Sequence, residues 1–474
     1  MQTTSVSYYP ISLREVKLKV NRKNGRRVRR KPSYPQIFLF GEDIVRVEGE
    51  IPVDLPVEQG QRFLFISHDQ TILTHGLHKY PAKFFPELPR WLIKRYSNEG
   101  ERVLDPFSGS GTTNVEALLN RRHSVGIDVD PFSRYLARVK TTPLNRDELE
   151  LLELSRDKLL QSVLDFQPSL VGDADIPKFP YRDQWFKKEI TLELAYIRKK
   201  VEELDADTGV KDFFKICFSS ILRSVSNADD NCTRTVVRKK LNKEICPSDA
   251  LTNFSEAVLI NVPKMLEFSQ RCQNAKDIFV EFPDNQDARS IKYPEDYFDL
   301  AVTSPPYANA VDYPRTHQLE IYWLGFETGS LTPLKKKHVG TESVSAADYR
   351  SLHKTAVKEA DDVIAKIYKK DPRRAYIAYK YLEDMRKNLR EVHKVLKRGG
   401  YYILVVGNNR IRNELFENWK YILTMAREIG FKVETYFASE IIKHFIKVPR
   451  EERINTDWIL VLKKSSSESS SGGC

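Results

Sequence analysis

A turn with two glycines separated by one residue is the first feature of this 474-residue sequence that could carry chemistry. A short apolar run leads into Asp105-Pro106-Phe107-Ser108-Gly109-Ser110-Gly111-Thr112-Thr113, and a helical pattern follows directly. Glycines let a ligand approach the backbone, and the N-terminus of the following helix offers free N–H groups to an anion or carboxylate. The pattern therefore predicts a nucleotide-type site. No Gly-Lys-Ser/Thr follows the glycines, which argues against a P-loop ATPase.

An aspartate follows at the distance expected for such a site. Asp128 lies 19 residues after Gly109, at the end of the strand-like run Ser124-Val125-Gly126-Ile127-Asp128. A carboxylate there can accept hydrogen bonds from both ribose hydroxyls of an adenosine-containing ligand. On these two features alone, an ordinary strand-to-helix turn with a surface aspartate is the alternative.

A second segment combines a buried-strand pattern with a sharp turn. Phe298-Asp299-Leu300-Ala301-Val302 leads into Thr303-Ser304-Pro305-Pro306-Tyr307. Two prolines cannot continue a central strand, so the chain must turn at the strand's carboxyl end, where open α/β sheets bind ligands. The Ser304 hydroxyl and the Pro305 carbonyl could hold an exocyclic amino group, and Tyr307 offers a flat face for stacking a base. A Pro-Pro turn that merely ends a strand is the alternative.

The elements that position these residues alternate between strands and helices on both sides of a long helical region. The N-terminal part is basic and contains a short β-rich stretch at residues 36–53. The central helical region has four stretches with apolar residues at three-to-four spacing, and we interpret it as an insertion. The C-terminal tail is low-complexity Ser/Gly sequence. The expected divisions are 1–70 (basic extension), 71–140 and 281–464 (the two halves of one α/β domain), 141–280 (helical insertion) and 465–474 (tail).

Particular elements follow from the apolar patterns of the second α/β half. We predict strands at 297–302, 401–406 and 458–462, and a helix at 376–396. The Gly399-Gly400 pair predicts a turn between that helix and the strand that follows it.

The two chemistry-bearing segments resemble those of the amino-methylating DNA methyltransferases that use S-adenosylmethionine. Asp105 to Gly111 is similar to that family's cofactor motif, Asp128 to its ribose-binding acid, and Ser304-Pro305-Pro306-Tyr307 to its catalytic tetrapeptide. The serine form is typical of enzymes that methylate N4 of cytosine, whereas adenine-N6 enzymes more often carry aspartate. The resemblance implies a Rossmann-like methyltransferase fold of the α/β class, with a mostly parallel seven-stranded sheet flanked by helices.

Three further segments are similar to parts of these enzymes. His78 to Phe84 resembles the segment that closes the methionine end of the pocket in these enzymes. Asp287-Ala288-Arg289 resembles the stretch whose acid contacts the adenine amino group, and Val395 to Gly400 resembles a common helix-turn-strand unit. The resemblance implies catalytic roles for Ser304, Pro305, Pro306 and Tyr307, and no metal. The residues it implies for S-adenosylmethionine are Lys83, Asp105, Pro106, Phe107, Gly109, Gly111, Thr112, Asp128, Asp287 and Ala288.

The implied reaction agrees with the residue types present. An exocyclic amine needs acceptors that hold its nitrogen in line with the methyl group, and no covalent intermediate is required. Methylation at carbon 5 of cytosine would need a cysteine nucleophile, typically in a Pro-Cys pair, and the adjacent pair here is the reverse, Cys246-Pro247. Because the amino group is paired and stacked in a duplex, the base must flip out, and Tyr307 is the expected stacking partner.

Composition and charge indicate a soluble, cytoplasmic protein with a polyanionic partner. No run of eighteen uncharged apolar residues and no signal-peptide layout are visible, and the five cysteines show no metal-binding spacing. Residues 12–32 hold ten Lys/Arg and one acid, so they contribute +9 of the net charge of +11. The resemblance implies double-stranded DNA and a cognate restriction endonuclease as partners, and no membrane is expected. The oligomeric state stays open.

The sequence departs from the family pattern in its long insertion, which leaves the DNA-reading segment open. The candidates are the insertion, with Arg234, Arg238, Lys239 and Lys240, and the region 326–350 with Lys335, Lys336 and Lys337. Adenine N6 or an RNA base is the nearest alternative substrate. Two alternatives come from other classes of protein. A nicotinamide-dependent oxidoreductase would share the glycine turn but has no use for Ser-Pro-Pro-Tyr. A catalytically silent DNA-binding protein would keep only the fold and the basic arm.

Overall fold

The computed structural model describes residues 44–230, 232–237, 243–308, 311–441 and 456–465. All of them belong to one compact unit, Asp43–Cys474. Several predicted features lie outside the described residues. They are the basic arm at 12–32, the first part of the β-rich stretch, Arg238, Lys239, Lys240 and the tail from 466 onward.

A nine-stranded sheet runs through this unit in the order β1-β2-β10-β11-β7-β6-β3-β4-β5. The pairs β10–β11 and β11–β7 are antiparallel, and the other neighbours pair in parallel. The sheet is mostly parallel, as predicted, but it has nine strands and not seven, because β1 and β2 extend it at one edge. The strands are β1 (Ile44–Glu48), β2 (Arg62–Ile66), β3 (Arg102–Asp105), β4 (His123–Gly126), β5 (Val280–Glu281), β6 (Phe298–Thr303), β7 (Leu396–Gly407), β10 (Phe431–Glu440) and β11 (Thr456–Lys464), with β8 (Asn409–Ile411) and β9 (Glu414–Phe416) in a separate hairpin.

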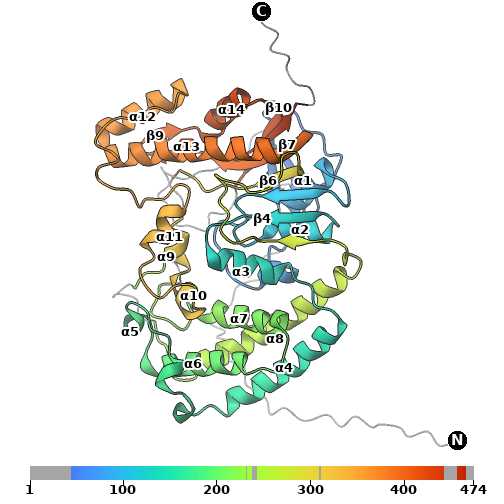
Figure 1. The fold of residues 1–474 in the computed structure, drawn as a ribbon, viewed down its shortest axis with the longest axis vertical. Coiled ribbons are helices and arrows are strands. Elements are labelled where there is room, and N and C mark those ends of the chain that lie inside the picture. Colours follow the sequence, from blue (N-terminus) through green and yellow to red (C-terminus); the bar gives the residue numbers. More distant parts are fainter. Residues whose placement is uncertain (1–43, 231, 238–242, 309–310, 442–455, 466–474) are drawn as a thin grey trace, which may run out of the picture. The chain divides into compact units, whose positions relative to one another are not determined.

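Helices cover both faces of the sheet because successive strand residues point to opposite sides. Leu104 of β3 and Leu404 of β7 share a core with α13 and α14, whereas their neighbours Val103 and Ile403 share a core with α1. This gives a helix-sheet-helix arrangement (Figure 1). The helices outside the insertion are α1 (Glu87–Tyr96), α2 (Thr112–Leu119), α3 (Pro131–Lys140), α9 (Tyr313–Thr316), α10 (Gln318–Trp323), α11 (Thr332–Lys337), α12 (Lys358–Lys370), α13 (Pro372–Val395) and α14 (Asn418–Ile429).

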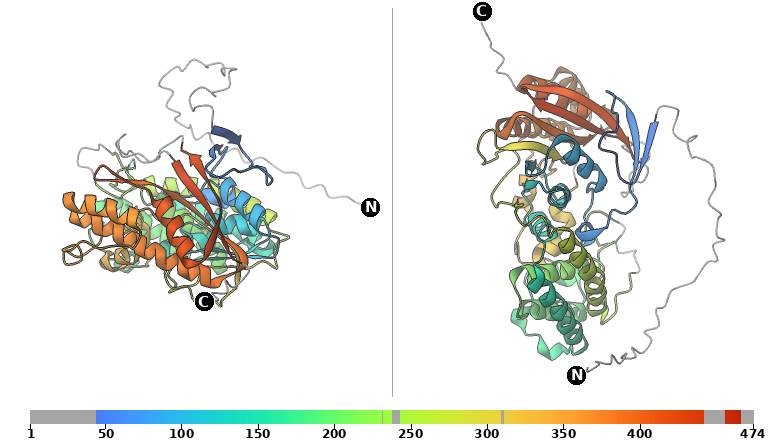
Figure 2. Two further views of the ribbon diagram at one scale, coloured as in Figure 1. Left: turned by 90° about the horizontal axis from the view of Figure 1, so that it is seen from above. Right: turned by 90° about the vertical axis from the view of Figure 1, so that its right-hand side faces the viewer.

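The region predicted to be a helical insertion contains helices and no strand among its described residues before Val280. Its helices lie together next to α3, at the opposite end of the unit from α12 and α14 (Figures 1 and 2). A capping box at Asn145 and Glu148 starts the first of them. Apolar residues of the insertion, such as Phe213 and Phe254, join α2 and α3 in a core of their own. The helices are α4 (Arg146–Leu164), α5 (Arg182–Trp185), α6 (Lys188–Glu202), α7 (Thr208–Ile221) and α8 (Asp249–Arg271).

The predicted strands at 297–302, 401–406 and 458–462 are present, but the turn predicted at Gly399-Gly400 is wrong. Strand β7 already begins at Leu396 and continues through both glycines. Phe298 of β6 pairs with Leu396, whereas Leu300 pairs with Tyr401, so the extra residues of β7 form a bulge within the sheet. Gly399, at φ +78°, makes this local irregularity possible without a break in the strand.

The strand order places the chemistry-bearing segments side by side. From β3 the chain continues to β4 and β5 on one side, and β6 and β7 lie on the other, so the order reverses between β3 and β6. Ligands bind open α/β sheets at the carboxyl ends of the strands beside such a reversal. Strand β3 ends at Asp105, and β6 ends at Thr303, next to Ser304. Across the described ranges, the structure has no helix with the length and apolar character needed to cross a membrane.

Candidate active site

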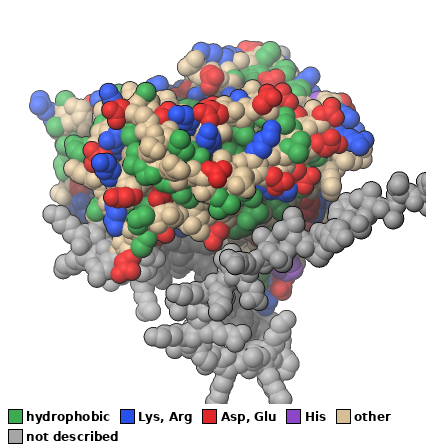
Figure 3. Space-filling view, turned by 90° about the horizontal axis from the view of Figure 1, so that it is seen from below, with side chains coloured by type: hydrophobic (Ala, Val, Ile, Leu, Met, Phe, Trp, Pro, Cys, Tyr) green, Lys and Arg blue, Asp and Glu red, His purple; other side chains and the backbone are tan. Residues whose placement is uncertain are grey.

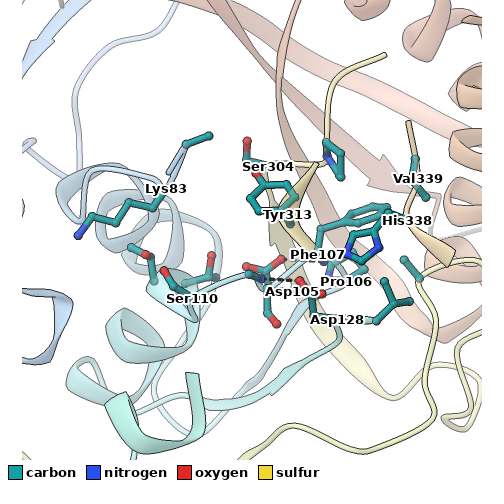
Figure 4. A pocket seen from close by; sticks show the side chains of 18 of the residues that line it. Lys83, Asp105, Pro106, Phe107, Ser110, Asp128, Ser304, Tyr313, His338 and Val339 are labelled. Atoms are coloured by element: carbon teal, nitrogen blue, oxygen red, sulfur yellow. Dashed lines mark hydrogen bonds between the residues drawn. The ribbon is translucent and has the colours of Figure 1, made fainter. Parts of the chain in front are cut away.

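A pocket of about 800 Å³, partly open to solvent, lies at the carboxyl ends of β3 and β6. Segments that are distant in the sequence meet in its wall, as Figure 4 shows for Asp105, Asp128 and Ser304. Most of the predicted site residues line it, but Gly111, Pro305 and Tyr307 are not part of the described lining. The predicted residues in the wall are Lys83, Asp105, Pro106, Phe107, Gly109, Thr112, Asp128, Asp287, Ala288, Ser304 and Pro306.

The glycine turn forms the floor between β3 and α2. The Gly111 amide donates to the Ser108 carbonyl at 2.7 Å, which closes a tight turn just before the helix. Gly109 and Gly111 have φ of +48° and +74°. A Cβ at Gly111 would lie 2.7 Å from the Ala137 Cβ on α3, so this position requires glycine both for its backbone conformation and for its close packing.

Asp128 is fixed beside the glycine turn by backbone amides. Its Oδ2 accepts from the Gly109 amide at 3.0 Å, and its Oδ1 accepts from the Asp130 amide at 2.8 Å. Burial raises the pKa of Asp128, and the nearby Asp130 carboxylate raises it further. The carboxylate therefore has a fixed orientation on the pocket wall, with lone pairs left to accept further hydrogen bonds.

Asp105 connects the two strands that carry the site. The hydroxyl of Thr303, the residue before Ser304, donates to Asp105 Oδ1 at 2.6 Å. The Phe107 amide donates to the same oxygen at 3.1 Å. Burial raises the pKa of Asp105 to about 6 in spite of these hydrogen bonds. The end of β6 is thus tied directly to the first residue of the glycine-turn segment.

The Ser-Pro-Pro-Tyr turn points its residues in different directions. Ser304 and Pro306 reach the pocket, while Pro305 is buried. The Tyr307 hydroxyl donates to Asp457 Oδ1 on β11 at 2.7 Å, and burial, with Asp457 beside it, raises the tyrosine's pKa well above the ordinary value. A Cβ at Gly407 would lie 2.9 Å from Tyr307 Cζ, so this glycine leaves room for the ring. Tyr307 is therefore anchored beside the pocket.

Lys83 lies at the edge of the pocket with its amine turned away from Asp105 (Figure 4). Its Nζ donates to the carbonyls of Gln70 and His75 at 3.1 and 2.9 Å, and burial lowers its pKa to about 8. In this geometry the amine holds the segment before α1 in place. Tyr80, from the same segment, is part of the pocket wall, and its ring stacks on Tyr313 with centroids 5.6 Å apart.

Asp287 lines the pocket as part of an ion pair. Arg289 donates from Nε to Asp287 Oδ1 at 2.9 Å and from a terminal nitrogen to Oδ2 at 2.7 Å. Burial alone would raise the pKa of Asp287, but the hydrogen bonds from Arg289 outweigh it and lower the pKa. The carboxylate therefore stays ionised at the pocket wall, and Ala288 contributes a small apolar surface beside it.

Several residues of the site belong to no motif that the sequence displays. Lys140 is buried at the end of α3, and its Nζ donates to the Ser110 carbonyl at 2.7 Å, beneath the glycine turn. Tyr313 and His338 line the opposite wall. The lysine's role depends on a contact between residues 30 positions apart, and His338 lies in a loop region without a recognisable motif. No group of His, Cys, Asp or Glu side chains suited to a metal ion occurs in the part of the chain that the structure describes.

Comparisons with known proteins find similarity to DNA methyltransferases. Residues 5–138 match a family model for N6 and N4 methylases, described as DNA methylase. The type II methyltransferase M.MvaI of Kocuria varians is 26% identical over 373 residues, which cover 75% of this chain and 81% of the relative. The comparisons support an N4/N6 DNA methyltransferase.

Two further type II methyltransferases match shorter parts of the chain. M.MjaII of Methanocaldococcus jannaschii is 30% identical over 172 residues, 35% of this chain and 32% of the relative. M.BsoBI of Geobacillus stearothermophilus is 25% identical over 284 residues, 55% of each protein.

Proposed function

We propose that this protein transfers a methyl group from S-adenosylmethionine to the N4 amino group of cytosine in duplex DNA. The observation that carries the proposal is the hydrogen bond from Thr303 to Asp105, which joins the Ser304 turn to the glycine turn at one pocket. A donor held on the Asp105 side and an amine held at Ser304 would meet in that pocket. We further propose that the enzyme protects DNA within a restriction-modification system, with a cognate endonuclease as partner.

The side chains present fit such a donor. The buried hydroxyls of Ser108 and Thr112 have no hydrogen-bond partner among the described residues, and both line the pocket, so a polar ligand would satisfy them. Asp128 would accept from the ribose, and Asp287 with Ala288 would contact the adenine. Asp105 would face the charged amine of the methionyl group. When bound, S-adenosylmethionine supplies a methyl group on a positively charged sulfur.

The protein's own part in the transfer is to hold the target amine. Ser304 Oγ and the Pro305 carbonyl accept hydrogens from the amine, so that its nitrogen is oriented toward the methyl group. Tyr307 stacks on the flipped base, and its bond to Asp457 keeps the ring in place. An amine that gains a methyl group must lose a proton, and because the pocket is partly open to solvent, that proton can pass to water while Ser304 only accepts a hydrogen bond. No covalent bond to the protein is needed.

Genome sequencing tests the base assignment. The protein would be expressed in a host without DNA methylation, and the genome read by a method that separates N4-methylcytosine from N6-methyladenine. We expect N4-methylcytosine at one short recognition sequence. N6-methyladenine alone would refute the assignment to cytosine while leaving the cofactor proposal intact, and the absence of both from the DNA would favour an RNA substrate or a silent protein.

The affinity for the cofactor should depend on pH through Asp105. The pKa of this buried carboxyl is raised to about 6, so at pH 5 most of the unliganded protein carries a proton there. Binding a positively charged amine requires the ionised form, so affinity should fall as pH drops below 6, by at most about tenfold per pH unit, and level off above it. The test is calorimetric titration with S-adenosylhomocysteine between pH 5 and 7.5. Asp105→Asn should flatten the profile. An equally steep profile in Asp105→Asn would contradict the assignment.

We propose that the insertion segment with Arg234 contributes to DNA binding. The Thr235 hydroxyl donates to the Thr316 carbonyl at 2.6 Å, which places this segment against the stretch that follows Ser-Pro-Pro-Tyr. Arg234 is about half exposed, 46%, and lies 3.8 Å from Glu342, a weak pairing that DNA could replace. On the face drawn in Figure 3, positive and negative side chains of the described residues are interspersed, so this face shows no continuous basic surface. The 326–350 region is close as well, since Lys335 pairs with Asp312 at 3.2 Å.

Arg234→Ala should weaken DNA binding about fivefold at moderate salt and reduce the slope of log K against log salt by about 1, because one phosphate contact is lost. Fluorescence anisotropy with a labelled duplex, repeated over a salt series, measures both. Arg146, 91% exposed on α4, supplies the control substitution Arg146→Ala, which should change neither value. An unchanged salt slope in Arg234→Ala would remove this residue from the DNA interface.

A further inference from the structure

His338 is a pocket residue that no motif assigns. It follows directly after α11 and forms part of the wall together with Lys337 and Val339 (Figure 4). Its side chain is 12% exposed. Its Nε2 lies 3.9 Å from Oδ2 of Asp130, whose backbone amide donates to Asp128. His338 therefore belongs to the end of the pocket where Asp128 is expected to hold the ribose.

Hydrogen bonding fixes which nitrogen of this imidazole can meet a ligand. Nδ1 lies 3.0 Å from the Leu334 carbonyl, which accepts hydrogen bonds but cannot donate them, so Nδ1 carries the hydrogen. In the neutral ring, Nε2 is then a lone-pair acceptor. This atom is buried and has no hydrogen-bond partner among the described residues. Its nearest carboxylate oxygen, Asp130 Oδ2, is 3.9 Å away, beyond hydrogen-bond distance.

The surroundings hold the ring in this orientation without a ligand. The Lys337 carbonyl accepts from Arg289 at 2.7 Å, and Val339 is buried, so the backbone is fixed on both sides of His338. The Tyr313 ring lies nearly parallel to the imidazole, with centroids 6.5 Å apart and planes 20° apart. A buried acceptor that is pre-oriented yet unsatisfied is the arrangement expected of a ligand contact.

We propose that His338 binds the nucleoside end of the methyl donor, with Nε2 accepting a hydrogen bond from a ribose hydroxyl. Both oxygens of Asp128 already accept a backbone N–H, from Gly109 and Asp130, and a second acceptor lets the two ribose hydroxyls bind to different groups. The inference rests on the proposed function, because it takes an adenosine-containing donor as the ligand. It adds a cofactor-binding residue outside the motifs that the sequence resembles.

The experiment compares S-adenosylhomocysteine with its 2′-deoxy and 3′-deoxy analogues by isothermal titration calorimetry. His338→Ala should raise the Kd of S-adenosylhomocysteine about fivefold to tenfold, the usual net effect of one hydrogen bond. For one of the two deoxy analogues the same substitution should have no effect, because the hydroxyl that His338 binds is already missing. His338→Gln should restore part of the affinity, since its amide oxygen can accept. His68→Ala, at a site with 67% exposure, is the matched control and should leave all three Kd values unchanged.

The outcomes separate this inference from the function on which it rests. A wild-type protein that does not bind S-adenosylhomocysteine refutes the proposed function and this inference together. Wild-type binding with no change in His338→Ala refutes the inference alone. An equal loss for S-adenosylhomocysteine and both analogues also refutes it, because His338 would then act on the shape of the loop and not on a ribose hydroxyl. Thermal unfolding of each variant identifies a folding defect. If His338→Ala is defective, the Kd values of His338→Gln are compared with those of wild type instead.

Discussion

Replacing Tyr307 with alanine should reduce methyl transfer to DNA on the order of 100-fold, because the flipped base loses its stacking partner and its alignment. The Kd for S-adenosylhomocysteine should stay within about twofold of wild type, since the ring is anchored on Asp457 and is not part of the described pocket wall. Initial rates with labelled S-adenosylmethionine and a duplex substrate, alongside calorimetry, measure the two quantities separately.

Tyr307→Phe is the matched control for that substitution. It keeps the aromatic face and removes only the hydroxyl that donates to Asp457, so it should cost about 1 kcal/mol of unfolding free energy and retain most of the activity. Equal losses of activity in the phenylalanine and alanine variants would show that the hydroxyl, and not the ring, is what the reaction needs.

Replacing Asp128 with alanine should raise the Kd for the cofactor on the order of 100-fold, because a charge-assisted hydrogen bond to a ribose hydroxyl is lost together with the support of the glycine turn. The substitution removes the acceptor for the ribose and also leaves the amides of Gly109 and Asp130 without their side-chain partner. The glycine turn would lose its support as well as its ligand contact. Equilibrium binding of S-adenosylhomocysteine measures the change.

Two further variants serve as controls for Asp128→Ala. Asp128→Asn keeps one acceptor oxygen of the same shape and should fall between wild type and alanine. Asp165→Ala removes an exposed aspartate at the end of α4 and should bind like wild type. If Asp128→Ala bound the cofactor as tightly as wild type, Asp128 would not be the ribose-binding acid.

The fold was predictable where one short segment determines it. The apolar runs of β3, β6 and β11 and the glycines after β3 indicate strands and a ligand-binding turn by local pattern alone. The bulge at Gly399 was not predictable in the same way. A Gly-Gly pair usually marks a turn, and its place inside β7 depends on pairing with β6, a partner that lies about one hundred residues earlier in the chain.

The candidate site shows the same division between local and long-range information. Asp105, Asp128 and Ser304 stand in motifs, and the structure brings them to one pocket. Lys140 was missed because its role follows from a tertiary contact with Ser110, 30 residues away. His338 was missed because only the folded chain brings it to the same pocket as Asp105 and Asp128. A lysine at a helix end and a histidine in a loop are, by sequence alone, ordinary surface residues.

The central claim is that one pocket brings a methyl donor and a cytosine amino group together. Its most direct test incubates the purified protein with duplex DNA and S-adenosylmethionine labelled in the methyl group, then digests the DNA and identifies the labelled nucleoside by mass spectrometry. We predict label in N4-methyldeoxycytidine, and none when Ser304→Ala replaces the wild-type protein. Label in a different nucleoside, or full activity of Ser304→Ala, would contradict the claim.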